Sequence, residues 1–235
     1  MYRLVDFPEP IRLTKVTWTS GPNARNSGTT TASDGAEQTR SGIGDVVSFR
    51  LDFTLKMGRE ARRERGFLTS LMEGVNAARF KFIDGDMLTP QEAGIVGPFV
   101  SQPWSNGEPW SNGKGWKPSY PIVPMAAASA YDASVVTLSD AFWGHQLGIG
   151  DYLGFMPFHF GLYMITQVIA PGQYRIWPRL RKALTTDDFA TLHPTLVMKT
   201  VPGGTSMARG VVHTDGQGVQ LSEIIDPYVR QYFTD

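Results

Sequence analysis

Apolar and polar residues alternate most regularly between Val47 and Leu55. Every odd-numbered position of this segment is apolar, and serine, arginine, aspartate and threonine occupy the positions between them. A period of two is typical of a strand with one buried face, because successive side chains of a strand point to opposite sides. The pattern therefore predicts a half-buried strand whose odd-numbered side chains, including Phe53, face a core.

A first strand precedes this one and changes face along its length. Its apolar residues occupy odd positions up to Leu13 and even positions from Val16, which predicts a bulge near Lys15. Between the two strands, the segment from Gly21 to Gly44 is rich in Ser, Thr, Asn and Gly and has almost no large apolar residue. Such a composition buries too little surface to order itself, and it predicts a mobile loop.

Between Arg59 and Gly74 the apolar spacing becomes that of a helix, and the glycine provides the stop signal. Apolar residues at i, i+1, i+4 and i+5 predict one buried helix face, formed by Phe67, Leu68, Leu71 and Met72. In the first half of the helix, four arginines are interleaved with two glutamates. An anion site is one interpretation, but a solvated face with ion pairs three and four residues apart is favoured. A Phe-x-Phe strand at 80–82 and an Asp-Gly turn at 84–85 follow.

The segment from Gly97 to Pro124 contains six prolines and three tryptophans. It includes a tandem near-repeat, Pro-Trp-Ser-Asn-Gly, at 103–107 and 109–113, and each Asn-Gly marks a tight turn. Two interpretations remain open: an exposed aromatic loop that binds a partner or a sugar, or an irregular loop held on the sheet by its own tryptophans. The candidate partner-contact residues are Trp104, Trp110 and Trp116.

After this loop, short apolar segments recur at regular spacing and predict strands at Val135–Leu138, Asp151–Phe155, Gly161–Ile169, Gln173–Trp177, Thr195–Val201 and Met207–Val212. Turn signals separate them at 148–151, 171–172, 202–204 and 215–216. A helical turn is predicted over Leu180–Ala190, and the run Val219–Tyr232 has nearly helical spacing.

These elements together predict a mainly β protein. Residues 1–96 form an N-terminal β-sandwich-like part with one short helix at 59–74, and residues 97–124 form the Pro/Trp/Gly-rich loop. Residues 125–235 form a C-terminal β part that closes as a small barrel or sandwich. The alternative of one continuous domain stays open.

Composition removes several classes of function. The chain has 235 residues, 22 basic and 22 acidic side chains, no cysteine, 25 glycines and 16 prolines. A neutral chain lacks the basic excess that binding to nucleic acid or to a membrane surface normally requires, so neither partner is expected. No secretory signal and no membrane-spanning helix are expected either. Without cysteine, thiolate catalysis and cysteine-ligated metal sites are excluded.

No motif of a familiar catalytic scaffold is present, and the chain is expected not to be an enzyme. Gly148-Ile149-Gly150 begins like a dinucleotide fingerprint, but the third glycine is displaced to Gly154 and no helix is expected to follow. The four histidines lack the spacing of metal ligands, and none is assigned a role: His145, His159, His193 and His213. Neither a cofactor nor a metal is expected.

Two carboxylate pairs, Asp84/Asp86 and Asp187/Asp188, could serve acid–base chemistry or bind a cation. The structural interpretation is favoured for both. The first pair fits a hairpin turn, and Asp187 fits the cap of a short helix.

The order of features resembles the tail-tip proteins of long-tailed bacteriophages and gene transfer agents, in particular the short distal tail proteins. The resemblance is carried by the N-terminal strand with a tryptophan, the polar loop, the alternating strand, the helix with its Phe-x-Phe strand, and three later motifs: Gly150-Asp151-Tyr152-Leu153, Leu162-Tyr163-Met164-Ile165 and Ile176-Trp177-Pro178-Arg179-Leu180-Arg181. It implies a virion structural protein, made in the host cytoplasm, that forms a ring, typically a hexamer, between the tail tube protein and the hub or baseplate proteins. It brings no catalytic residue.

Two other functions are open on the sequence. A carbohydrate-binding or adhesion module would use the three loop tryptophans as a stacking platform. A hydrolase of unknown type would use one of the carboxylate pairs, and it ranks last.

Overall fold

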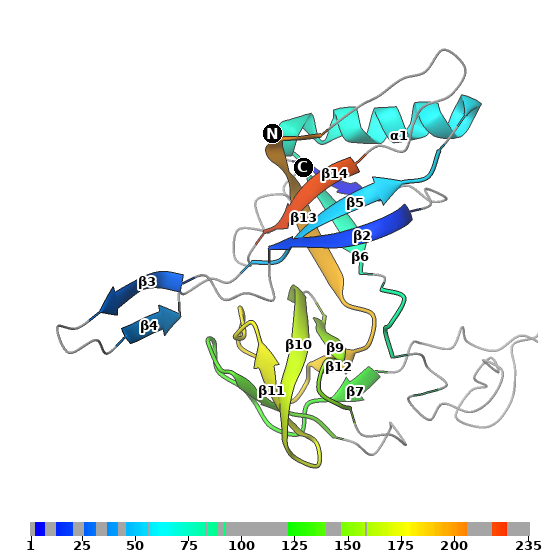
Figure 1. Cartoon of the computed structure of the whole chain (residues 1–235). Helices are drawn as coiled ribbons and strands as arrows, with labels where there is room; N and C mark the ends of the chain where they lie inside the picture. Colours follow the sequence, from blue (N-terminus) through cyan, green and yellow to red (C-terminus); the bar gives the residue numbers. More distant parts are fainter. Residues whose placement is uncertain are drawn as a thin grey trace, which may run out of the picture.

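The computed structural model describes residues 3–7, 13–20, 26–31, 37–41, 46–55, 57–82, 84–88, 92, 122–139, 147–157, 159–205 and 218–224. Strands dominate this part of the chain, which has two six-stranded sheets, a separate two-stranded sheet and one α-helix (Figure 1). The mainly β fold of the sandwich or barrel class is therefore confirmed.

The first sheet combines strands from distant parts of the sequence. Its order is β1 (Leu4–Asp6), β6 (Ala77–Lys81), β13 (Thr195–Thr205), β14 (Gly218–Glu223), β5 (Ser48–Phe53) and β2 (Leu13–Ser20). Only β1 and β6 run parallel, and the remaining described neighbours are antiparallel. The two halves of the sheet are joined through β13 and β14.

The alternating segment forms β5 as predicted. Its odd-numbered side chains from Val47 to Phe53 are almost completely buried, whereas Leu55 is 55% exposed because it lies beyond the end of the strand. The predicted bulge in the first strand is also present, since the register of β2 against β5 shifts between Leu13 and Lys15.

Helix α1 (Gly58–Ser70) and a 3₁₀ turn, η1 (Met72–Gly74), lead from β5 to β6. Three of the four predicted apolar residues are buried, but Met72 is 59% exposed. The prediction was wrong there because the α-helix has ended and Met72 has a positive φ of 46°. Gly74 ends the turn as predicted, with φ 96°, and a Cβ at this position would lie 2.6 Å from the Thr200 carbonyl oxygen. No helix in the described residues is long and apolar enough to cross a membrane.

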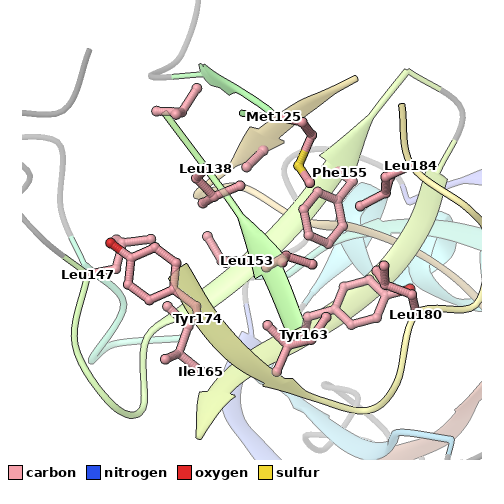
Figure 2. Packing of buried hydrophobic residues seen from close by; sticks show 14 of the residues in the cluster. Met125, Leu138, Leu147, Leu153, Phe155, Tyr163, Ile165, Tyr174, Leu180 and Leu184 are labelled. Atoms are coloured by element: carbon pink, nitrogen blue, oxygen red, sulfur yellow. The ribbon is translucent and has the colours of Figure 1, made fainter. Parts of the chain in front are cut away.

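The second sheet, called the barrel sheet here, has the order β7 (Ile122–Pro124), β12 (Phe189–Thr191), β9 (Tyr152–Met156), β10 (His159–Ala170), β11 (Gln173–Trp177) and β8 (Val135–Thr137). Its two edges meet: Ala126 N–H donates to the Thr137 carbonyl at 2.9 Å, and Ser139 N–H donates to the Pro124 carbonyl at 3.0 Å. The sheet therefore curls round a core of its own. Figure 2 shows this core, which is formed by residues that include Leu153, Phe155, Tyr163, Ile165 and Tyr174.

Five of the six strands predicted after residue 134 are present, while the segment 207–212 lies outside the described residues. The predicted helical turn over Leu180–Ala190 was wrong: the chain makes a turn and then forms β12. Helical spacing was also misleading at Val219, because the start of that run is β14 and its alternate side chains are buried. Pro202-Gly203-Gly204 lies within β13, at a register shift rather than at a turn between strands.

The segment between β2 and β5 is not the loop that its composition predicts. Strands β3 (Asn26–Thr31) and β4 (Glu37–Ser41) pair with each other and form the separate two-stranded sheet. Main-chain pairing and threonines, which favour strands, specify a hairpin here although the segment has almost no large apolar residue. In Figure 1 this hairpin extends away from both large sheets.

Strand β10 of the barrel sheet contributes side chains to the cores of both large sheets. Leu162 packs into the core of the first sheet, and its neighbour Tyr163 packs into the core of the barrel sheet. Aromatic contacts add to this junction: the ring centroid of Tyr152 lies 6.0 Å from that of Trp18 and 5.0 Å from that of Phe82. The barrel sheet is thus continuous in its packing with the first sheet.

Candidate functional site

The predicted partner-contact residues Trp104, Trp110 and Trp116 lie outside the described residues, and so do His145 and His213. Their proposed roles stay predictions.

Both carboxylate pairs lie in turns. Asp84 Oδ1 accepts a hydrogen bond from Asp86 N–H at 3.2 Å, as expected for a turn. In the second pair, Asp188 rather than Asp187 caps the turn, because its Oδ2 accepts from the Thr185 N–H at 2.7 Å and from the Thr185 hydroxyl at 3.0 Å. No helix follows it, so the cap predicted for Asp187 was wrong. Among the described residues, no group of three or more potential ligands could hold a metal ion.

The Gly148-Ile149-Gly150 segment is a tight turn that leads into a strand. Gly148 N–H donates to Asp151 Oδ2 at 2.7 Å, and Gly150 has φ 97°. Strand β9 begins directly afterwards, so the helix N-terminus that would bind a pyrophosphate is not at this position.

The chemically most distinctive group is a buried polar cluster at the junction of the two sheets. It consists of His159 and Tyr163 on β10, Arg181 after β11, and Glu223 at the end of β14. Tyr163 is fully buried, and each of the other three is at most 6% exposed. Buried polar groups of this kind are expected to be hydrogen-bonded, and short contacts meet part of that expectation, although His159 Nδ1 has no hydrogen-bond partner among the described residues.

A short hydrogen bond joins His159 to Tyr163 within the cluster. The Arg181 backbone N–H donates to the Tyr163 hydroxyl oxygen at 3.2 Å, and the same oxygen lies 2.6 Å from His159 Nε2. The tyrosine hydroxyl donates to Nε2 in one neutral tautomer of the imidazole and accepts from it in the other.

Electrostatics favour the neutral state. Burial, followed by the positive charges of Lys182 and Arg181, lowers the pKa of His159 to about 3. The imidazole thus remains neutral across the physiological range.

An ion pair between Arg181 and Glu223 connects the barrel sheet to the first sheet. The side chains are only 4% and 1% exposed. The second carboxylate oxygen of Glu223 accepts a hydrogen bond from Val47 N–H at 3.2 Å, and the Arg181 guanidinium lies 5.8 Å from the Tyr163 ring centroid. The cluster therefore joins β5, β10, β14 and the segment after β11.

The sequence contained a signal for half of this cluster. In the run Val219, Leu221, Glu223, the acid occupies a position that alternation assigns to the core. Nothing local indicates that Arg181, 42 positions earlier in the chain, is its partner. Because the cluster is buried, no substrate can reach the imidazole or the phenol, and its role is to hold the two sheets together.

A second feature concerns charge on the surface. Four arginines of α1 are exposed, whereas Glu64, which was expected to lie among them on a solvated face, is only 3% exposed. That expectation was wrong because Glu64 lies on the side of the helix that carries the buried residues Phe67 and Leu68. The exposed side of α1 is correspondingly more basic than the sequence suggests.

Comparison with protein-family models and with curated proteins found no match.

Proposed function

We propose that this chain is a structural subunit of a phage tail tip, a distal tail protein, which forms a ring between the tail tube and the hub or baseplate. In this function the chain performs no chemistry, and its partners are copies of itself and the neighbouring tail proteins. Its place is in the virion after synthesis in the host cytoplasm. The ring is expected to contain six copies.

The observation that supports this proposal best is the bare hairpin β3–β4. An isolated two-stranded hairpin is at best marginally stable in water, and its edges present unpaired main-chain groups to any strand that approaches. The hairpin belongs to neither large sheet. An element of this kind gains stability when another protein covers it, which favours an assembly subunit over a self-contained enzyme.

The buried cluster supports the same interpretation. Its only close histidine–hydroxyl contact, His159 with Tyr163, is shielded from solvent, so the described residues offer no accessible nucleophile and base at this point. The carbohydrate-binding alternative depends on the loop tryptophans Trp104, Trp110 and Trp116, which lie outside the described residues.

Electron microscopy of the purified chain tests the proposal. Ring-shaped particles, with a mass by native mass spectrometry of six times the 25.9 kDa chain, are the expected result. A matched variant in which a short Gly-Ser linker replaces residues 26–41 should retain the near-ultraviolet circular dichroism of the body and lose the rings. A chain that remains monomeric at every concentration and binds to a glycan array would contradict the ring and favour the carbohydrate-binding module.

A further inference from the structure

The exposed charges of the described residues include one cluster of arginines and two turns that each contain a pair of aspartates. Some exposed carboxylates are paired with an arginine: Asp6 with Arg79 at 2.7 Å and Asp132 with Arg179 at 3.0 Å are examples. The arginine face of α1, formed by Arg59, Arg62, Arg63 and Arg65, is different. None of these four has an ion-pair partner in the part of the chain that the structure describes.

The arginine face is unfavourable for the isolated helix. Arg59 has a like charge three and four residues away, at Arg62 and Arg63, and such pairs destabilise a helix. Arg59 also lies in the first turn of α1, at the positive end of the helix dipole, where a cation is disfavoured. Glu60 is the only exposed acid on the helix. A local conflict of this kind is typical of a surface that functions in contact with something else.

The composition around the arginine face favours a protein as the partner. Leu55 and Met57 before α1, and Met72 and Val75 after it, are each at least 44% exposed. Arginine and methionine are enriched at protein interfaces. A phosphate backbone would not use the apolar side chains, and the chain as a whole has no net positive charge.

Matching negative charge lies on the barrel side of the same chain. One acidic turn contains Asp84 and Asp86, and the other contains Asp187 and Asp188; Asp86 and Asp187 are exposed and have no ion-pair partner among the described residues. The first turn follows Phe82, whose ring centroid lies 5.0 Å from that of Tyr152 at the start of β9.

The second acidic turn leads into β12, whose Phe189 pairs with Met156 at the other end of β9. Tyr152 and Met156 are four residues apart, so the two acidic turns are separated by roughly 13 Å along β9. The Cα atoms of Arg59 and Arg65 are about 9 Å apart along the helix axis, and their long side chains extend this reach. Figure 1 shows α1 at the end of the first sheet that lies away from the barrel sheet.

We propose that the arginine face of α1 in one copy binds the two acidic turns of the next copy, which gives a head-to-tail contact. This inference rests on the proposed ring and names the surfaces that would form it. Opposite charges at opposite ends of a neutral chain suit such a heterologous interface, because each copy offers one surface of each sign and the chain of contacts can close.

A charge-exchange experiment tests the proposal. Variant Arg62→Glu/Arg63→Glu reverses the arginine face, and variant Asp86→Arg/Asp187→Arg reverses the acidic turns; no hydrogen bond of these four side chains is needed for the fold as described. Each variant alone is expected to self-associate about a hundredfold more weakly than the natural chain, since like charges then face each other. An equimolar mixture is expected to recover the association, because the acidic helix of one variant meets the basic turns of the other.

A variant with the same change of net charge elsewhere, Arg175→Glu/Lys199→Glu, is the control and should associate normally; both residues are exposed on strands of the two sheets. Sedimentation velocity measures the association, and raising NaCl from 50 mM to 500 mM should weaken it because salt screens exposed charges. Rings that form equally well in Arg62→Glu/Arg63→Glu would overturn the contact and leave the ring intact. A natural chain that never assembles would contradict the ring itself. Tight binding of a DNA duplex by the arginine face at 150 mM salt, with no effect of the charge exchange on assembly, would overturn the contact in favour of a nucleic-acid surface.

Discussion

Removing one partner of the buried Arg181–Glu223 ion pair should be among the most damaging single changes that this fold can suffer. The pair is nearly inaccessible to water, with side-chain exposures of 4% and 1%. In Glu223→Gln the guanidinium would remain buried without its counter-charge, and truncation of this kind costs about 3–5 kcal/mol. Glu223→Ala also removes the acceptor for Val47 N–H, which adds about 1–3 kcal/mol. Since a domain of this kind has a total stability of about 5–15 kcal/mol, either variant is expected to be close to unfolding.

The same reasoning gives a different result when both charges are removed. In the double variant Arg181→Met/Glu223→Gln no charge is left buried, the methionine refills part of the volume, and the glutamine oxygen can still accept from Val47 N–H. Replacing both members of a buried pair is often nearly neutral. We therefore expect the double variant to be more stable than Glu223→Gln, with a coupling free energy of about 3 kcal/mol or more between the two sites.

Equilibrium unfolding in urea at pH 7, followed by tryptophan fluorescence and circular dichroism, measures these free energies. Because the ion pair connects the two sheets, the two probes should separate in Glu223→Ala, where the sheets lose their shared polar contact, and coincide in the natural chain. The reasoning is refuted if Glu223→Gln loses less than about 1 kcal/mol, or if the effects of the two single variants simply add in the double variant.

Three further predictions concern separate features. The pKa of His159 is about 3 in the folded chain and about 6.5 in the unfolded chain. As the pH falls, the unfolded chain therefore binds a proton before the folded chain does. The stabilising contribution of neutral His159 is complete above pH 6.5 and is lost as the pH falls towards 3. Between pH 8 and pH 5 the loss from this group should be about 2 kcal/mol, and comparison of urea midpoints with His159→Gln isolates it; equal pH slopes in the two proteins would contradict the assignment. Phe53 is only 2% exposed, so Phe53→Asp should lose several kcal/mol of stability and fail to fold. Thr54→Asp, at a partly exposed neighbouring position, should have a mild effect on stability. Circular dichroism and solubility distinguish the two variants, and two equally folded variants would mean that the assigned buried face of β5 is wrong. Gly74→Ala should destabilise the fold by about 1–3 kcal/mol, because the residue has φ 96° and its Cβ would lie 2.6 Å from the Thr200 carbonyl oxygen. Gly66→Ala lies inside α1 with nothing within 4 Å of its Cβ, and it should stabilise the fold by up to about 1 kcal/mol. Thermal unfolding of the two variants measures both effects, and signs opposite to these would contradict the argument.

Local periodicity predicted the elements that have a simple environment. Strand β5 has one buried and one more exposed face, so alternation was sufficient to locate it and to orient Phe53. The bulge near Lys15 was predictable for the same reason, since a change in parity requires an extra residue in the strand.

Prediction failed where the environment is set by distant parts of the chain. Val219 begins a run with helical spacing, yet it lies in a strand because β5 and β13 provide partners on both sides. The hairpin β3–β4 was missed because its sequence lacks the apolar alternation that predicts a strand, whereas main-chain pairing defines it. The polar cluster requires Arg181 and Glu223 to meet across two sheets, which no local pattern specifies.

The strand order of the first sheet has a consequence for biosynthesis. Strands β2 and β5 can pair early, and so can β1 and β6, but β13 and β14 stand between these two pairs. At about 5–20 residues per second, the ribosome needs roughly 10–30 s to proceed from the end of β5 at residue 53 to the end of β14 at residue 223. During that interval the inner edges of β5 and β6 lack their final neighbours, and unpaired strand edges invite pairing with other chains. The nascent chain therefore passes through an aggregation-prone stage that ends only when its last described strand has been synthesised, and co-expressed chaperones should raise the soluble yield of this protein.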